Sequence, residues 1–513
     1  MIVIIVAFFQ NLLRRACENF FLLFKFKDDP VEEGKEEGRI RYGVRKPANP
    51  IKLLSRLEPH HWLALFIGFL AVYVDLLDFY VLAAAIKKIS TYFGTSKTHV
   101  SDSLTYSMSM RIVGAGLFGL LGDYFGRKWP LVLNLFMLAG LQIASIYCHT
   151  IDQFLNVRLI FGLAMGGVYG LAASNLMENA PPESRGLLGG IFQSGAAASG
   201  LTSAAINLGV GPKPDSWKKM FWITIGLTFG AAVVRILIPE SKQFRDAAKR
   251  KKNSLHGQTY KQRLIKFCKE FRKMLLLHWQ TFVYCCIFVT LFQWAVHTYA
   301  DNYVTFLIVS KGMTNSRASK ITMITKAGCI IGVWTMGWLG EYIGRRRMAA
   351  FSALMAAITL PASIVPTSFS GLAAGGFFYQ FFFETYGAIL AAHLNELSPI
   401  AFRAVMPGIA YQFGASVSAP AAMIVNDIAE DKFIMQNGKR VEAYEPVIGT
   451  IMGIVYFLQI VFSLFGPEKR GADLAHFKPA GLEDDDEELP IGHHLPERGR
   501  SQSDVKDDKV PSL

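Results

Sequence analysis

Long apolar stretches separated by short polar segments dominate the chain between residues 62 and 466. Each stretch is about 20 residues long, the length that an α-helix needs to cross the hydrocarbon core of a bilayer. In chain order they cover residues 62–84, 104–122, 129–148, 153–174, 186–210, 219–238, 279–308, 320–340, 347–366, 371–394, 404–426 and 447–466. The pattern predicts an all-α membrane protein with twelve transmembrane helices. An even number of crossings places both ends of the chain on one side of the membrane.

Composition agrees with this interpretation. The 513 residues are 51% hydrophobic and include 39 phenylalanines, and the mean hydropathy is +0.29, which is too apolar for a soluble enzyme of this size. No G-x-x-x-x-G-K-[ST] segment is present to bind phosphates, and the cysteine spacing suggests neither a metal site nor disulfides. We therefore expect no enzyme activity, no cofactor and no metal, and any transport would be driven by gradients.

The distribution of basic residues predicts how the chain is oriented in the membrane. Lys and Arg exceed Asp and Glu by 53 to 40, an excess that in a soluble protein would suggest nucleic acid. Here twelve Lys/Arg and only three acids fall between residues 239 and 275, whereas each loop predicted on the opposite side has at most three basic residues. The positive-inside rule therefore makes residues 239–278 a cytoplasmic linker, with both termini cytoplasmic. The bilayer, and not nucleic acid, is the predicted partner.

Both ends of the chain are expected to be cytoplasmic tails. Residues 1–60 begin with an apolar run too short to span, so residues 1–26 are either an interfacial helix or a misassigned start. Residues 467–513 include the acidic run 483–488 and are predicted to be disordered. Lys478, Lys506, Lys509 and the serines near residue 501 are candidate sites for trafficking or ubiquitination machinery.

Two motifs about sixty residues apart recur together later in the chain. GLLGDYFGRK at 119–128 returns as GWLGEYIGRR at 337–346, an offset of 218 residues. The same offset relates ENAPPESR, beginning at Glu178, to ELSPIAFR, beginning at Glu396. This duplication divides the chain into related halves at 61–238 and 279–466.

The repeated motif has a physical interpretation as a turn outside the bilayer. Gly119 and Gly122 offer a smooth helix face, and Asp123 can accept hydrogen bonds from a helix N-terminus. Gly126 and the basic residues after it would turn the chain and leave positive charge outside the membrane. In the fourth span, glycines follow Arg158 at four-residue spacing and predict close helix packing.

The motif G-x-x-x-D-x-x-G-R-[RK], with its echo in the second half, resembles the loop motif of the major facilitator superfamily. The resemblance covers residues 62 to about 466. It implies two six-helix pseudo-symmetric halves around a central site that opens alternately to each side. The motif residues expected to act in gating are Gly119, Asp123, Gly126, Arg127, Arg158, Glu178 and Arg185, with Gly337, Glu341, Arg345, Glu396 and Arg403.

Ionisable residues inside the predicted spans are candidates for function, because burying a charge in a bilayer costs several kcal/mol unless it is paired or meets water. Asp75 and Asp78 share one face of the first span, where a structural pairing with Arg158 is the alternative. Arg111 lies midway along the second span. Lys326 and Glu384, in the eighth and tenth spans, could instead pair with each other.

The seventh span has four polar residues at four-residue spacing. Gln293, His297, Asp301 and Thr305 predict one polar stripe along an otherwise apolar helix. We expect Arg111 to bind a carboxylate through its forked, permanently charged guanidinium, with Gln293, His297, Thr305 and Lys326 as further substrate ligands. The proton-coupling candidates are Asp75, Asp78, His297, Asp301 and Glu384.

Three passages show a closer resemblance. Residues 111–131, 158–186 and 391–414 are similar to the fungal Jen-type lactate/pyruvate permeases, proton symporters in the sialate/lactate branch of the superfamily. The seventh helix of that family has N-x-x-[ST]-H-x-[ST]-Q-D-x-x-x-T. This chain keeps the His, Asp and Thr at 297, 301 and 305 and departs at four positions: Gln293, Val296, Tyr299 and Ala300. The resemblance implies a plasma-membrane proton symporter of short carboxylates, and the departures leave the particular substrate open.

Two alternatives remain at this point. Pro239-Glu240-Ser241 and Pro467-Glu468-Lys469 resemble the sugar porters of the same fold, although their paired glutamines are missing from the seventh span. A sugar or sugar-acid porter is therefore one alternative. A nutrient sensor that signals through its tails without transport is the other.

Overall fold

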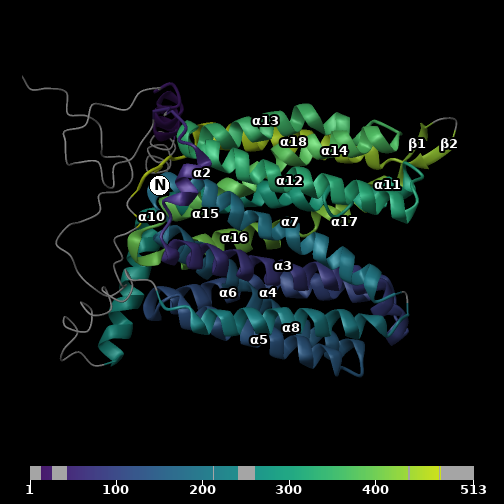
Figure 1. The fold of residues 1–513 in the computed structure, drawn as a ribbon, viewed down its shortest axis with the longest axis horizontal. Helices are drawn as coiled ribbons and strands as arrows, with labels where there is room; N and C mark the ends of the chain where they lie inside the picture. The colour runs from purple at the N-terminus through teal and green to yellow at the C-terminus, as the bar shows by residue number, and fades with distance from the viewer. Residues whose placement is uncertain are drawn as a thin grey trace, which may run out of the picture.

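The computed structural model describes residues 13–25, 43–44, 46–211, 213–240, 260–436, 439–472 and 474. Its long helices lie side by side, roughly parallel to one direction, and the first half of the chain forms one side of the bundle and the second half the other (Figure 1). We call the side of the membrane where α8 (Ser216–Leu237) ends and α10 (Tyr260–Tyr299) begins the linker side. The opposite side is the hairpin side, after the small antiparallel pair of β1 (Phe433–Gln436) and β2 (Lys439–Glu442).

Each half has six helical columns. In the first half these are α3 (Pro59–Phe93), α4 (Lys97–Phe125), α5 (Lys128–Ile146), α6 (Ile151–Asn179), α7 (Arg185–Gly209) and α8 (Ser216–Leu237). In the second half they are α10 (Tyr260–Tyr299) with α11 (Tyr303–Val309), α12 (Asn315–Ile343), α13 (Arg345–Ile364), α14 (Phe369–Phe383) with α15 (Thr385–Leu397), α16 (Val405–Ser418) with α17 (Ala421–Asp431), and α18 (Tyr444–Phe465). The short elements α2 (Pro50–Ser55), η1 (Pro182–Ser184) and η2 (Ile400–Phe402) lie between columns or before them. Every predicted span corresponds to one column, which confirms the fold class.

Nine helical segments of the described ranges are long and apolar enough to cross a membrane. The remaining columns are α7, α12 and the pair α14 and α15. Of these, α7 and α12 pack against each other across the boundary between the halves, where a Cβ added to Gly190 would lie 2.0 Å from the Val333 carbonyl oxygen. Small residues at this contact let the two helices approach closely, and such residues lower the mean hydropathy of a span. Large apolar side chains on the outside of the bundle, such as Trp129, Ile358 and Phe457, are exposed, as expected for helices solvated by lipid.

Local sequence explains where the columns begin and turn. Ser96, Thr150, Thr314 and Ser368 each accept a hydrogen bond from the backbone N–H three residues later, which caps the helix that follows. Gly126 and Gly344 have φ values of +100° and +119° between successive helices. Side chains rarely adopt that conformation, so the glycine of the duplicated motif is needed for the turn in both halves.

Three columns are interrupted where continuous spans were predicted. The seventh breaks at residues 300–302, the tenth at Glu384, and the eleventh next to Pro420, whose ring nitrogen cannot donate a helical hydrogen bond. The second part of the predicted linker is helical, because α10 begins at Tyr260. Residues 241–259 of that linker lie outside the described residues.

Parts of both predicted tails are ordered against the bundle. Residues 13–22 are helical, whereas residues 1–12 lie outside the described part of the chain. The first residues after α18 are not a solvated tail, because Glu468, Arg470 and Leu474 are buried. The acidic run, Lys478, Lys506, Lys509 and the serines near residue 501 are beyond the described residues.

Candidate functional site

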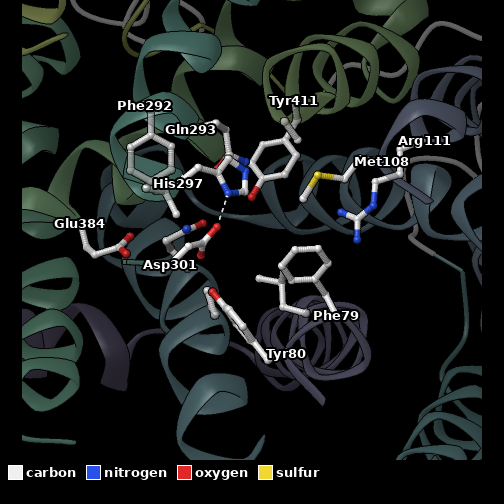
Figure 2. A pocket seen from close by; sticks show the side chains of 15 residues that line it. Phe79, Tyr80, Met108, Arg111, Phe292, Gln293, His297, Asp301, Glu384 and Tyr411 are labelled. Atoms are coloured by element: carbon white, nitrogen blue, oxygen red, sulfur yellow. Dashed lines mark hydrogen bonds and ion pairs between the residues drawn. The ribbon is translucent and has the colours of Figure 1, made fainter. Parts of the chain in front are cut away.

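A cavity lies between the two halves and contains about 580 Å³ of empty space, including the part open to solvent. Its wall combines α3, α4 and α7 of the first half with α10, α16 and the junction of α14 and α15 in the second. The lining residues are Leu76, Phe79, Tyr80, Met108, Arg111, Gln193, Ala196, Phe292, Gln293, Val296, His297, Asp301, Glu384, Tyr411 and Ala415. In Figure 2, Arg111 and Glu384 stand at opposite sides of this lining, with His297 and Asp301 between them. Five of the nine residues predicted for binding or proton coupling therefore meet here: Arg111, Gln293, His297, Asp301 and Glu384.

Arg111 is the cation of the cavity wall contributed by the first half. Its side chain is buried, with Nη2 2.9 Å from the Met165 Sδ and the guanidinium carbon 5.7 Å from the centre of the Phe79 ring. Its Nε has no hydrogen-bond partner among the described residues. The backbone behind it is fixed by close packing, since a Cβ on Gly166 would lie 2.1 Å from the Arg111 carbonyl oxygen. A buried guanidinium with an unused donor is well suited to accept an anion.

His297 and Asp301 form a pair on the opposite wall. The His297 Nδ1 lies 2.7 Å from the Asp301 Oδ2, and the two residues are one helical turn apart at the end of α10. The His297 side chain is 8% exposed, whereas that of Asp301 is 31% exposed. The pair thus has one buried member and one that reaches solvent.

The predicted polar stripe does not continue past Asp301. The helix is interrupted at residues 300–302, and Thr305 lies in the separate helix α11, exposed and outside the cavity lining. The helical spacing that put Thr305 in line with His297 assumed an unbroken helix. The stripe therefore consists of Gln293, His297 and Asp301.

Asp75 and Asp78 are buried in the first half but do not line the cavity. The charge of Asp75 acts on Arg111, and that of Asp78 acts on Arg158. Arg158 is fully buried, and its guanidinium carbon lies 4.6 to 5.2 Å from three aromatic ring centres, those of Phe154, Phe161 and Phe221. The structural alternative of a pairing with Arg158 thus applies to Asp78, whereas Asp75 lies behind the cavity cation.

Glu384 and Lys326 differ in position. Glu384 is buried, lines the cavity and occupies the break between α14 and α15. Lys326, on α12, is half-buried and outside the lining, although its charge acts on Glu384. Lys326 is therefore placed to influence a ligand through Glu384 and not by direct contact in this conformation.

The first copy of the duplicated motif joins the two halves on the linker side. The Arg127 Nη2 lies 3.1 Å from the Asp123 Oδ1 and 2.7 Å from the Glu178 Oε1, and all three side chains are buried. Asp123 also accepts hydrogen bonds of 2.9 and 3.0 Å from the backbone N–H groups of Ala404 and Val405, at the start of α16 in the other half. As the sequence suggested, Asp123 caps a helix N-terminus, and this contact joins the halves.

In the second copy an arginine again lies between two carboxylates, and here the contact between the halves runs from the second half to the first. Arg345 donates to Glu341 and makes two hydrogen bonds of 3.0 and 3.1 Å to the carboxylate of Glu396. Glu341 in turn accepts a 3.2 Å hydrogen bond from the Gly186 N–H, at the start of α7 in the first half. Each half thus reaches a helix start of the other.

The remaining motif arginines bind the segment after α18. The Arg185 Nη1 donates to the Ala472 carbonyl at 2.6 Å, and the Arg403 Nη1 donates to the Leu474 carbonyl at 3.1 Å. Glu468 accepts from the backbone N–H of Arg345 at 3.2 Å. Burial by itself raises the pKa of the Glu468 carboxyl, but Arg346, with smaller contributions from His393 and Arg470, outweighs burial and holds that pKa below its ordinary value. Glu468 is therefore ionised at neutral pH, and this segment is part of the closed linker side.

Sequence reasoning missed the aromatic part of the cavity. Phe79, Tyr80, Phe292 and Tyr411 line it, together with the sulfur of Met108. Apolar residues of a transmembrane helix can face lipid, protein or a cavity, and hydropathy does not separate these cases. Their neighbours in the sequence gave one indication of this. Phe79 and Tyr80 directly follow Asp78, and Phe292 directly precedes Gln293.

Comparisons with known proteins support both the fold and a role in transport. The sugar (and other) transporter family matches residues 63–479. A carboxylic acid transporter protein homolog of Saccharomyces cerevisiae is 28% identical over 445 residues, which cover 83% of this chain and 71% of that protein. The cis,cis-muconate transport protein of Acinetobacter baylyi is 24% identical over 422 residues, or 81% of this chain and 97% of that protein.

Among solved structures, the proton:xylose symporter XylE superposes with a TM-score of 0.61 at 16% identity, covering 81% of this chain and 98% of that one. At this level of identity the likeness shows the fold alone. The family match, by contrast, extends over most of the chain. The chain therefore belongs to the sugar (and other) transporter family, and it is a multi-pass secondary transporter with the major facilitator fold and not an enzyme.

Proposed function

We propose that this protein is a plasma-membrane proton symporter of short-chain carboxylates of the lactate and pyruvate kind, working by alternating access. The observation that carries the proposal is the cavity between the halves, with the buried cation Arg111 on one wall and the His297–Asp301 pair on the other. A small organic anion needs a fixed positive partner in a low-dielectric site, and a guanidinium matches a carboxylate in shape and charge.

The proposed cycle begins from a conformation closed on the linker side. By the positive-inside rule this side is the cytoplasm, so the cavity would accept substrate from outside. A proton binds at the His297–Asp301 pair, or at Asp75, Asp78 or Glu384, and the anion binds Arg111. Because the proton cancels the charge of a monocarboxylate, enclosing the loaded cavity costs less free energy than enclosing the anion alone. The halves then separate on the linker side, where the two motif networks must open.

A second candidate substrate class is favoured by the cavity wall. Four aromatic side chains line the same cavity as Arg111, and such rings pack well against flat, unsaturated ligands. One relative is described as a muconate transporter, and muconate is a flat, unsaturated carboxylate. A larger planar carboxylate would use the same cation, so the two candidates differ in which part of the lining the body of the ligand contacts.

The decisive experiment measures uptake in a host that lacks carboxylate uptake. We expect labelled lactate and pyruvate to accumulate faster at acidic than at neutral external pH, and an uncoupler to abolish the difference. Benzoate or muconate as the better competitor would select the planar class, and competition by hexoses would indicate a sugar porter. Absence of uptake for every carboxylate, together with a growth response that requires the C-terminal tail, would support the sensor instead.

Loss of the His297–Asp301 pair should separate binding from proton coupling. His297→Ala and Asp301→Asn each remove a charge-assisted hydrogen bond, worth about 1.5–3 kcal/mol, so we expect proton-driven accumulation to fall roughly tenfold to hundredfold. Exchange of internal for external carboxylate, which needs no net proton movement, should be affected less. Thr305→Ala is the matched control, because Thr305 belongs to the same predicted stripe but lies outside the cavity. Equal losses in all three variants would contradict the assignment.

A further inference from the structure

A short helix formed by residues 13–22 is docked on the linker-side ends of α13 and α18. The ring of Phe20 stacks on that of Phe465, the last residue of α18, with centroids 5.1 Å apart. The Asn19 side chain donates to the Phe465 carbonyl at 3.3 Å, and Leu23 is buried. The helix therefore has a defined inner face and a defined depth, at the level where a membrane span ends.

Two arginines at the start of α13 bind this helix. The Arg346 Nη1 and Nη2 donate to the Asn19 carbonyl at 3.1 and 3.2 Å. The Arg347 guanidinium donates to the carbonyls of Leu22 and Lys25 at 3.3 and 3.0 Å, and its Nε donates to that of Leu23 at 2.9 Å. The last carbonyls of a helix have no partner within it and carry a partial negative charge, so Arg347 acts as a C-terminal cap.

The outer face of the same segment is apolar and open. Leu13 and Phe21 are each 71% exposed and Phe24 is 60% exposed, and the exposed Cys17 is one turn from Phe21 on that face. Arg14, at the exposed start of the helix, is paired with Glu18, and Arg15 donates to the Gln280 side chain. Exposed aromatic rings with a basic end, at the depth where a span ends, are the features of a helix lying in the interface of a bilayer.

We propose that the outer face of residues 13–24 binds the boundary between head groups and acyl chains in the leaflet on the linker side. The apolar rings would enter the outer part of the acyl region, and the basic start of the helix would face anionic head groups. Because Arg346 and Arg347 directly follow Arg345 of the closed motif network, the helix ties this leaflet to the start of α13. The proposal is independent of the substrate and of proton coupling.

The test uses the full-length protein in nanodiscs, with an environment-sensitive fluorophore on Cys17. Cys268→Ser removes the other exposed cysteine of the described residues, since Cys148, Cys285, Cys286 and Cys329 are buried. We expect nitroxide groups placed high on the lipid acyl chains to quench the probe, and water-soluble quenchers to have little effect. Quenching by the soluble reagent alone would overturn the proposal.

A double variant tests whether the exposed rings cause the binding. Phe21→Glu with Phe24→Glu should lower lipid quenching by about twofold or more, because it places two charges in the interface. Met435→Glu is the matched control, since Met435 is 72% exposed but lies in the hairpin on the opposite side of the membrane. Discs loaded with one protein keep a second copy from covering this face during the measurement. Unchanged quenching in the double variant would overturn the role of the two rings.

Discussion

Arg111→Ala is expected to abolish carboxylate uptake. The substitution removes the only Arg or Lys among the described residues that line the cavity and would leave an enclosed anion without its permanently charged partner. Removing one member of a buried charge pair costs about 3–5 kcal/mol, which corresponds to an affinity loss of a few hundredfold or more. Initial uptake rates at several substrate concentrations, normalised to protein in the membrane, would measure it.

Two further variants separate charge from geometry and from folding. Arg111→Lys keeps the charge but not the fork of donors, so we expect weak uptake with a raised KM. Asp75 lies behind Arg111, and Arg111→Ala with Asp75→Asn shows how much of the loss comes from an uncompensated carboxylate. Full activity of Arg111→Ala would place the anion elsewhere, with Lys326 as the next candidate.

The second large effect is expected for Arg345→Met, which should destabilise the protein and open the linker side. Arg345 is fully buried between Glu341 and Glu396, so its loss leaves two buried carboxylates without their cation. The expected cost is again about 3–5 kcal/mol. A lower melting temperature in detergent, together with faster labelling of single cysteines introduced on the linker side, would measure the two consequences.

The duplicated half offers a matched comparison for this prediction. Arg127→Met removes the equivalent cation from between Asp123 and Glu178 and should have a similar effect. Adding Glu341→Gln and Glu396→Gln to Arg345→Met should recover part of the stability, because the stranded charges are then gone. A melting temperature of Arg345→Met equal to that of the unmodified protein would show that this network does not stabilise the closed conformation.

The sequence predicted the fold well because lipid makes hydropathy informative. The twelve spans and the 218-residue repeat follow from apolar length and motif recurrence, and each corresponds to a helical column. The breaks were not predicted, because hydropathy averages over many residues. At Glu384 the chain remains apolar on both sides of the interruption, and only Pro420 marked a break by its chemistry.

The site was predicted in its ionisable residues and missed in its aromatic ones. Arg111 and His297 stood out because charged and polar groups are rare inside a span, and both face the cavity. Asp78 stood out for the same reason, yet it lies beside Arg158 inside the first half. The sequence pattern shows which face of its helix a residue occupies, but it does not show which other helix or cavity that face contacts. Tyr411 shows the converse, since nothing in its local sequence separates a cavity wall from packing.

The interruption at residues 300–302 has a mechanical consequence. The Asn302 side chain donates to the carbonyls of His297 and Thr298 at 3.3 and 3.1 Å, and so satisfies groups that a broken helix would leave bare. The interruption therefore leaves these carbonyls paired, as the low polarity of a membrane interior requires. Asp301 lies in the interruption, whereas His297 lies within α10. Under the proposed cycle, a swing of α11 toward the cavity mouth would stretch or shorten the bond between these two side chains, so that enclosing the cargo would act on the pair that holds the proton.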